Sequence, residues 1–186
     1  MNDLELRTGL PEHLRVLADL YPREGWEGHR NFDEMTRFWL DRHLMFREVM
    51  DRLRRDSEGF ADGTLDARTY QSRTARMTGF FLNQLHGHHT IEDGHYFPQL
   101  IALDARISAG FELLHRDHEM LDAQIQALAD ATNTLLQAVD GPTGPSEAGY
   151  QVDRLNGFQT FLNRHLCDEE DLVVPLILEN GPRLNF

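Results

Sequence analysis

Histidine and glutamate recur at the same spacing in two separate stretches of the sequence. Glu92 follows His88 by four residues, and Glu169 follows His165 by four residues. In both stretches a proline comes ten residues after the histidine. Residues four apart lie on the same face of an α-helix. An imidazole and a carboxylate placed in this way are ligands that a transition metal accepts.

A single histidine precedes each of these pairs. His43 comes 45 residues before His88, and His118 comes 47 residues before His165. The two halves are therefore offset by about 75–77 residues, which predicts a duplicated helical hairpin. The four histidines and two glutamates fall on apolar stripes, and such groups are costly to bury unless they are paired or bind metal. We expect them to converge in the core.

The number of donor atoms predicts a centre with two metal ions. Two octahedral ions need about twelve ligand positions, of which four imidazoles and two bridging carboxylates fill about eight. A bridging oxo or hydroxo group would take about two more and leave room for a small exogenous ligand. Mixed nitrogen and oxygen ligation suits iron, with manganese or zinc as alternatives.

Four segments with helical periodicity would position these residues. Apolar residues recur at intervals of three and four residues in each of them, strand-like alternation is absent, and the connections are short. The segments cover about residues 31–55, 65–103, 105–139 and 147–179. The prediction is all-α: an antiparallel up-down four-helix bundle over 31–180, preceded by an arm over 1–30, in one domain over 1–186. In the arm, Leu14, Leu17 and Leu20 are expected to pack on the bundle.

Composition excludes several classes of partner and site. The chain has 186 residues with 18 Lys+Arg against 31 Asp+Glu, a net charge of −13, which disfavours nucleic acid. The single cysteine, Cys167, excludes an internal disulfide and any Cys-rich metal site. No signal peptide is recognisable, and no apolar run is long enough to cross a membrane. We expect a soluble, cytoplasmic protein without a membrane partner.

At these residues the sequence resembles the hemerythrin-like, or HHE cation-binding, family over about residues 30–180. The resemblance implies a four-helix bundle around a non-haem di-iron centre that binds dioxygen, peroxide or nitric oxide. It implies the following iron ligands: His43, His88, Glu92, His118, His165 and Glu169. Two alternatives remain open at this site, an iron- or oxygen-sensing module and a catalase-like, peroxide-scavenging activity.

The resemblance leaves the number of histidine ligands open. Hemerythrin itself uses five histidines and two carboxylates, so His115, three residues before His118, is a candidate fifth ligand. The number matters because reversible oxygen binding needs a single protected position, whereas further openings favour peroxide chemistry. His89 can also reach Glu92, but the match to the second pair favours His88. His86, His89 and His95 are therefore assigned supporting or surface roles.

A ferritin-like di-iron site is the competing arrangement in a helical bundle. It needs Glu-x-x-His pairs on two helices and single glutamates on two others. Two such strings occur, Glu92–His95 and Glu112–His115, but they lie on adjacent helices only 20 residues apart, and the single glutamates required on two other helices are not evident at core positions. This arrangement is disfavoured. His29 is a further candidate for a role near the metal, and Asp168 or Glu170 for orienting an imidazole from another helix.

Overall fold

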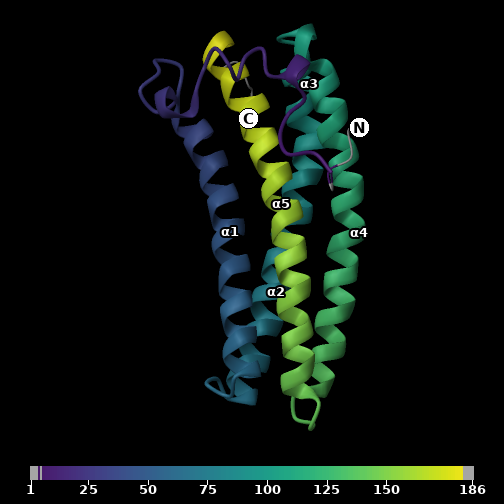
Figure 1. Ribbon diagram of the computed structural model, residues 1–186. Coiled ribbons are helices and arrows are strands. Elements are labelled where there is room, and N and C mark those ends of the chain that lie inside the picture. The colour runs from purple at the N-terminus through teal and green to yellow at the C-terminus, as the bar shows by residue number, and fades with distance from the viewer. Residues whose placement is uncertain (1–3, 5, 182–186) are drawn as a thin grey trace. The chain divides into compact units, whose positions relative to one another are not determined.

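The computed structural model describes residue 4 and residues 6–181, and four long helices dominate this part of the chain (Figure 1). They are α1 (Glu34–Ala61), α2 (Ala67–Ile91), α4 (Ser108–Ala138) and α5 (Gly144–Asn180). Between α2 and α4 lie a π-helical turn, η3 (Glu92–Tyr96), the short helix α3 (Phe97–Ile101) and the 3₁₀ turn η4 (Ala105–Ile107). The arm contains two further 3₁₀ turns, η1 (Glu12–Leu14) and η2 (Arg23–Gly25). The described residues include no strand, and the predicted all-α, four-helix bundle is confirmed.

Aspartate caps set the first residues of the first two long helices. The Thr36 amide donates to Asp33 Oδ1 at 2.8 Å, and the Thr69 amide donates to Asp66 Oδ1 at 2.9 Å. The first helix was predicted to end near residue 55, but it continues through Gly59 to Ala61. A glycine inside a helix costs only about 1 kcal/mol relative to alanine, and the buried Phe60 offsets this cost.

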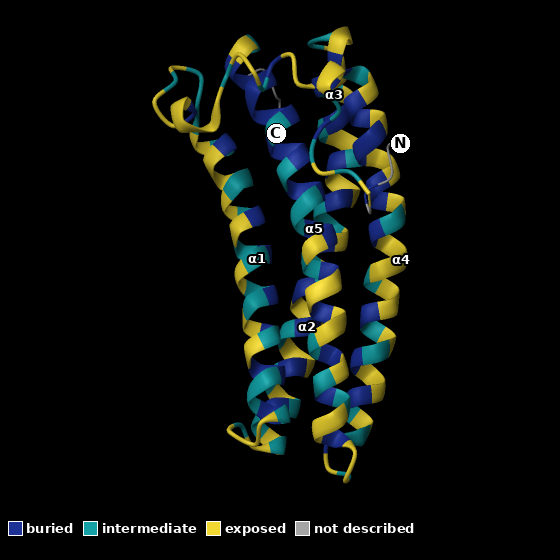
Figure 2. Cartoon of the chain, viewed as in Figure 1, coloured by how far each residue is buried: buried dark blue, intermediate teal, exposed yellow. Residues whose placement is uncertain are grey.

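The residues divide into two packing units, and each long helix contributes one part to each unit. Unit 1 comprises Met1–Leu44, His88–Glu119 and Phe161–Phe186, and unit 2 comprises Met45–Gly87 and Met120–Thr160. In unit 2 the aromatic rings of Phe60 and Tyr70 stack at 4.6 Å, and Leu135, Val139 and Ala148 pack in the same cluster. Within each unit, buried residues alternate along the helices with exposed ones (Figure 2).

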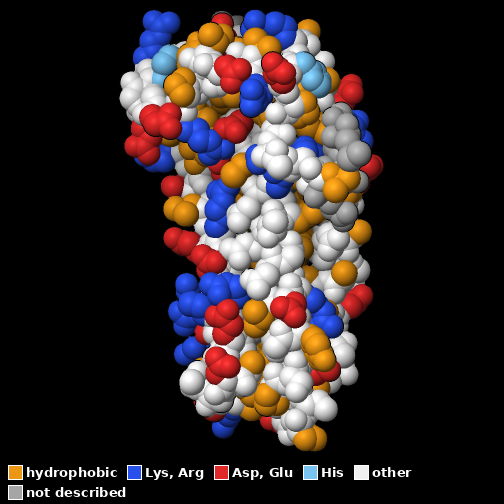
Figure 3. Space-filling model, in the orientation of Figure 1, with side chains coloured by type: hydrophobic (Ala, Val, Ile, Leu, Met, Phe, Trp, Pro, Cys, Tyr) orange, Lys and Arg blue, Asp and Glu red, His pale blue; other side chains and the backbone are white. Residues whose placement is uncertain are grey.

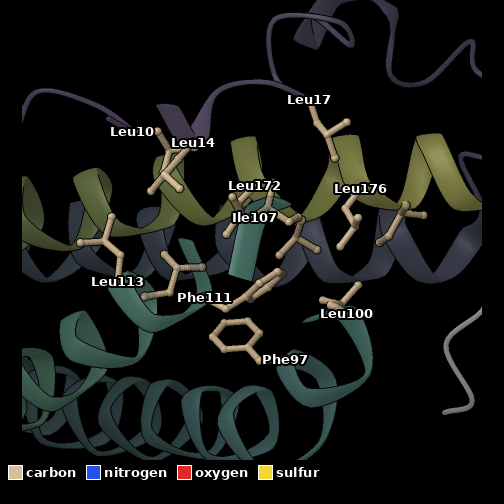
Figure 4. Packing of buried hydrophobic residues seen from close by; sticks show 13 residues of the cluster. Leu10, Leu14, Leu17, Phe97, Leu100, Ile107, Phe111, Leu113, Leu172 and Leu176 are labelled. Atoms are coloured by element: carbon tan, nitrogen blue, oxygen red, sulfur yellow. The ribbon is translucent and has the colours of Figure 1, made fainter. Parts of the chain in front are cut away.

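The arm belongs to the core of unit 1. Leu10, Leu14 and Leu17 pack against residues of α3, η4, α4 and α5 (Figure 4). The expected burial of Leu14 and Leu17 is correct, whereas Leu20 is 64 % exposed and makes no part of this core. The prediction for Leu20 fails because the arm is not a continuous helix. Short 3₁₀ turns and loops replace the helical period on which the prediction depended.

Pro98 predicts that its helix kinks or ends nearby, and α2 does end before it, at a π-helical turn. The α-helical pattern of α2 ends at Ile91, the turn takes up Glu92–Tyr96, and Pro98 lies in the first turn of α3. Proline has no amide hydrogen and cannot make the usual bond four residues back, which destabilises a helix interior. Pro98 avoids this cost because it lies in the first turn of α3, whereas Pro175 lies inside α5. π-Helical turns are frequent at functional sites, and this one begins at Glu92.

Charged side chains are frequent on the surface, among scattered exposed hydrophobic ones. Side chains of aspartate, glutamate and arginine are spread over the face seen in Figure 3. Among the described residues, no helix has a stretch both long and apolar enough to span a bilayer.

Candidate metal centre

Seven metal-ligand side chains converge inside unit 1, and they come from five elements. One ligand atom of each lies within 4.8 Å of those of its neighbours, in two groups. The mixed group consists of His43 on α1, His88 on α2, Glu92 on η3 and Glu169 on α5. The histidine group consists of His89 on α2, His118 on α4 and His165 on α5. All seven are buried except His88, which is partly buried.

In the mixed group the donor atoms face one another. His43 Nε2 lies 3.0 Å from His88 Nε2, and His88 Nε2 lies 3.0 Å from Glu92 Oε1. Glu169 Oε2 lies 3.6 Å from His43 Nε2. Because both histidines direct the same nitrogen inwards, their lone pairs can meet on a single cation.

The histidine group has the same inward arrangement. His118 Nε2 lies 3.2 Å from His165 Nε2. The ring of His89 stacks on that of His118, with centroids 4.1 Å apart and an angle of 11° between the planes. The ring of His89 also meets His165 edge-on at 5.4 Å. Three imidazoles thus surround one position.

Both glutamates lie between the two groups. Glu169 Oε2 is 3.5 Å from His165 Nε2 in the histidine group as well as close to His43. Glu92 directs Oε1 to His88 and places Oε2 3.8 Å from His118 Nε2. A carboxylate so placed can bridge two cations, one from each group.

Several buried polar atoms of the site have no hydrogen-bond partner. They are both ring nitrogens of His89, Glu92 Oε2 and both carboxylate oxygens of Glu169. A buried polar atom without a partner costs about 1–3 kcal/mol, and more when it carries charge. Cations held by these atoms would remove that cost, so the donor set fits metal ions.

Acids on the opposite half of the chain orient the two single histidines. His43 Nδ1 lies 3.0 Å from Glu170 Oε1, and His118 Nδ1 lies 3.0 Å from Asp93 Oδ1. Each acid comes five residues after the paired histidine of its own half. Only the His43–Glu170 pair has the geometry of a hydrogen bond, whereas His118 Nδ1 and Asp93 Oδ1 are close without forming one. An imidazole that donates its Nδ1–H to a carboxylate keeps the Nε2 lone pair free for metal. Of the two acids considered from the sequence, Glu170 therefore takes this position.

Burial governs the protonation of the site. It lowers the pKa of His43 and lowers that of His89 and His165 well below the usual range, so these rings are neutral and able to bind metal. Burial, together with the charge of Glu92, raises the pKa of Glu169 well above its usual range. Two buried carboxylates this close repel each other unless cations lie between them.

A tryptophan donates a hydrogen bond to one of the two glutamates that lie between the groups. Trp39 Nε1 donates to Glu92 Oε1 at 2.8 Å, and its ring lies 4.3 Å from that of His43. The indole therefore restrains both the carboxylate and the imidazole on which it packs.

Replacing Trp39 by phenylalanine is expected to weaken metal binding about tenfold, because a hydrogen bond to a charged group contributes about 1.5–3 kcal/mol. The measurement is a competition titration against a chelator of known affinity. Trp26→Phe is the matched control, since Trp26 Nε1 donates to the backbone oxygen of Tyr21 and not to the site. Equal affinities for the two variants would show that the hydrogen bond to Glu92 does not matter for binding.

The six residues predicted from the sequence all lie in these two groups, and His89 joins them. His89 is only 3 % exposed, so a surface role for it is wrong. His115 is 57 % exposed, contacts Asp93 and Glu119, and belongs to neither group. The signal in the sequence was the doublet itself: consecutive helical residues point about 100° apart and can face two neighbouring positions.

The other histidines lie outside both groups. His13, His86 and His95 are exposed, and His29 accepts a hydrogen bond from the Asn31 amide within the arm. The exposure of His95 and His115 removes the histidines that a ferritin-like arrangement would use. Cys167 is partly buried and likewise contributes to neither group.

The model of the hemerythrin HHE cation-binding domain matches residues 34–177, a range that includes all seven residues of the site. No curated protein and no solved structure matches the chain.

Proposed function

Because this chain belongs to the hemerythrin HHE cation-binding domain family, we propose that its seven-residue site holds two iron ions and binds one small molecule, dioxygen or a related ligand. The ligands in this proposal are the six predicted residues together with His89. They are His43, His88, His89, Glu92, His118, His165 and Glu169.

The number of donors is the observation that carries the proposal. Two octahedral ions offer about twelve positions, and five imidazoles with two bridging carboxylates fill about nine. A bridging oxo or hydroxo group would fill about two more, which would leave about one position for an exogenous molecule. Had His89 been outside the site, a further position would be open. A single opening favours reversible binding of one small molecule over peroxide turnover.

The surroundings of the site favour a diatomic ligand. Iron held by these residues would supply the redox chemistry that binding of dioxygen requires. The chain's part is to hold the ions and keep bulk water out. The ring of Phe97 stacks on His118 with centroids 5.6 Å apart, and Phe97 in turn packs on Phe111 at 5.1 Å. An apolar wall of this kind limits access of water to the ligands.

The test is the visible spectrum of the iron-loaded protein. We expect about two iron ions per chain, and a band that develops in air and reverses under vacuum. The zinc-loaded protein is the control, because zinc has no redox chemistry and gives no such band. Protein that takes up no iron after reconstitution would overturn the proposal. Rapid loss of added peroxide with gas evolution, without a reversible band, would replace oxygen binding by a peroxide-scavenging activity.

A further inference from the structure

A buried arginine of the arm reaches the acids behind the histidine group. The side chain of Arg7 is only 4 % exposed. Its Nε donates to Asp168 Oδ2 at 2.6 Å, and its Nη1 donates to Asp117 Oδ1 at 2.9 Å. Asp117 and Asp168 are themselves buried, and Arg7 provides a cation shared by both that offsets the cost of their burial.

Asp117 connects this ion pair to a ligand imidazole. Its Oδ2 lies 3.4 Å from His165 Nδ1, on the side of the ring away from the site. Arg7, Asp117 and His165 thus form a continuous chain of polar contacts from the arm to the histidine group. Asp168 also pairs with Arg164, whereas Arg7 is the arginine that contacts Asp117. Without Arg7, Asp117 would be a buried carboxylate that has lost the partner holding it toward His165.

A second arginine of the arm begins a corresponding chain of polar contacts to the mixed group. Arg23 Nη1 donates to Glu170 Oε2 at 2.6 Å, and Arg23 Nε donates to Asp171 Oδ1 at 2.7 Å. The other oxygen of Glu170 lies 3.0 Å from His43 Nδ1. Glu170 is therefore held at both oxygens, by the arm on one side and by the ligand imidazole on the other.

From these two chains of contacts we propose that the arm positions ligands of the metal centre. Arg7 positions His165 through Asp117, and Arg23 positions His43 through Glu170. Each arginine thereby controls the retention of one of the two ions, Arg7 that of the histidine group and Arg23 that of the mixed group. The inference rests on the two-ion site proposed above. It predicts that loss of one arginine loosens one ion and leaves the other in place.

The experiment follows release of iron from the loaded protein into excess chelator. Removing a partner that orients a metal ligand typically weakens binding about 10–100-fold. We expect Arg7→Gln and Arg23→Gln each to release one equivalent of iron about 10–100-fold faster than wild type, and the other equivalent at the wild-type rate. Arg15→Gln is the control, because Arg15 lies in the same arm and pairs only at the surface, with Asp19.

Combination with a ligand variant identifies which ion each arginine governs. In a His89→Ala background, which retains the ion of the mixed group, Arg23→Gln should accelerate release and Arg7→Gln should not. A variant that merely weakens the fold releases both ions faster, since unfolding frees both. Arg23 is 41 % exposed, so Arg23→Gln is expected to fold even where Arg7→Gln does not.

Two results would overturn the inference. One is wild-type release of both ions from either arginine variant, and the other is equal acceleration of both ions, which would mean that the arm only stabilises the fold. These outcomes differ from failure of the proposed function, in which wild-type protein itself binds no iron.

Discussion

Replacing Glu169 by glutamine is expected to reduce bound iron from about two ions per chain to less than about half an ion. Glu169 Oε2 lies 3.5–3.6 Å from one imidazole nitrogen in each group, so its carboxylate serves both positions. Glutamine keeps the size of the side chain but loses the charge and one acceptor oxygen. The site would then keep five neutral imidazoles and one carboxylate for two cations of charge two or three.

Iron and protein determination after reconstitution and desalting measures this effect. Glu119→Gln is the matched control, because Glu119 is 70 % exposed and lies outside both groups. Circular dichroism of both variants checks that the helices remain. Retention of two ions by the folded Glu169→Gln variant would refute the assignment of Glu169 as a bridging ligand.

His89→Ala is expected to lose about one of the two ions, whereas His115→Ala keeps both. His89 is one of only three donors in the histidine group, and neither of its ring nitrogens has another hydrogen-bond partner. His115 contacts only acids near the surface. Each substitution removes one imidazole, at a buried position in His89→Ala and at an exposed position in His115→Ala. Each variant therefore serves as the control for the other.

The iron content of the two variants decides which histidine is the fifth ligand. Loss of iron from His115→Ala with full retention by His89→Ala would reverse the assignment. The visible spectrum adds a second measurement: a site that lacks His89 has about one more open position, and we expect the reversible band to be lost even where iron remains.

The helices and six of the seven converging residues could be predicted from local pattern. Apolar residues at helical intervals give the amphipathic faces, and the fixed spacing of His88–Glu92 and His165–Glu169 marks the inward positions. Two halves that repeat the same spacing constrain each other, which is why the single histidines could be found as well. That pattern predicts position on a face and does not depend on tertiary detail.

His89 could not be found in this way because helical spacing admits only one of two consecutive residues to a given face. Its burial depends on the presence of a second group of donor atoms beside the mixed group. The other members of that group, His118 and His165, come from helices far away in the sequence. The roles of Arg7 and Arg23 were equally hidden. Both belong to an arm without a regular period, and their partners are more than a hundred residues away.

The π-helical turn shows how two related halves of a chain can diverge without losing a contact. Asp93 in that turn and Glu170 in a regular helix occupy equivalent positions, and both lie 3.0 Å from the Nδ1 of a histidine. The side chains differ by one methylene, and the backbones that carry them differ in winding. The difference in helical winding and the difference in side-chain length compensate for each other. Replacing Asp93 by glutamate, or Glu170 by aspartate, would therefore change the distance between the acid and the histidine Nδ1. Replacing the whole turn, with its backbone and its acid together, would preserve that distance.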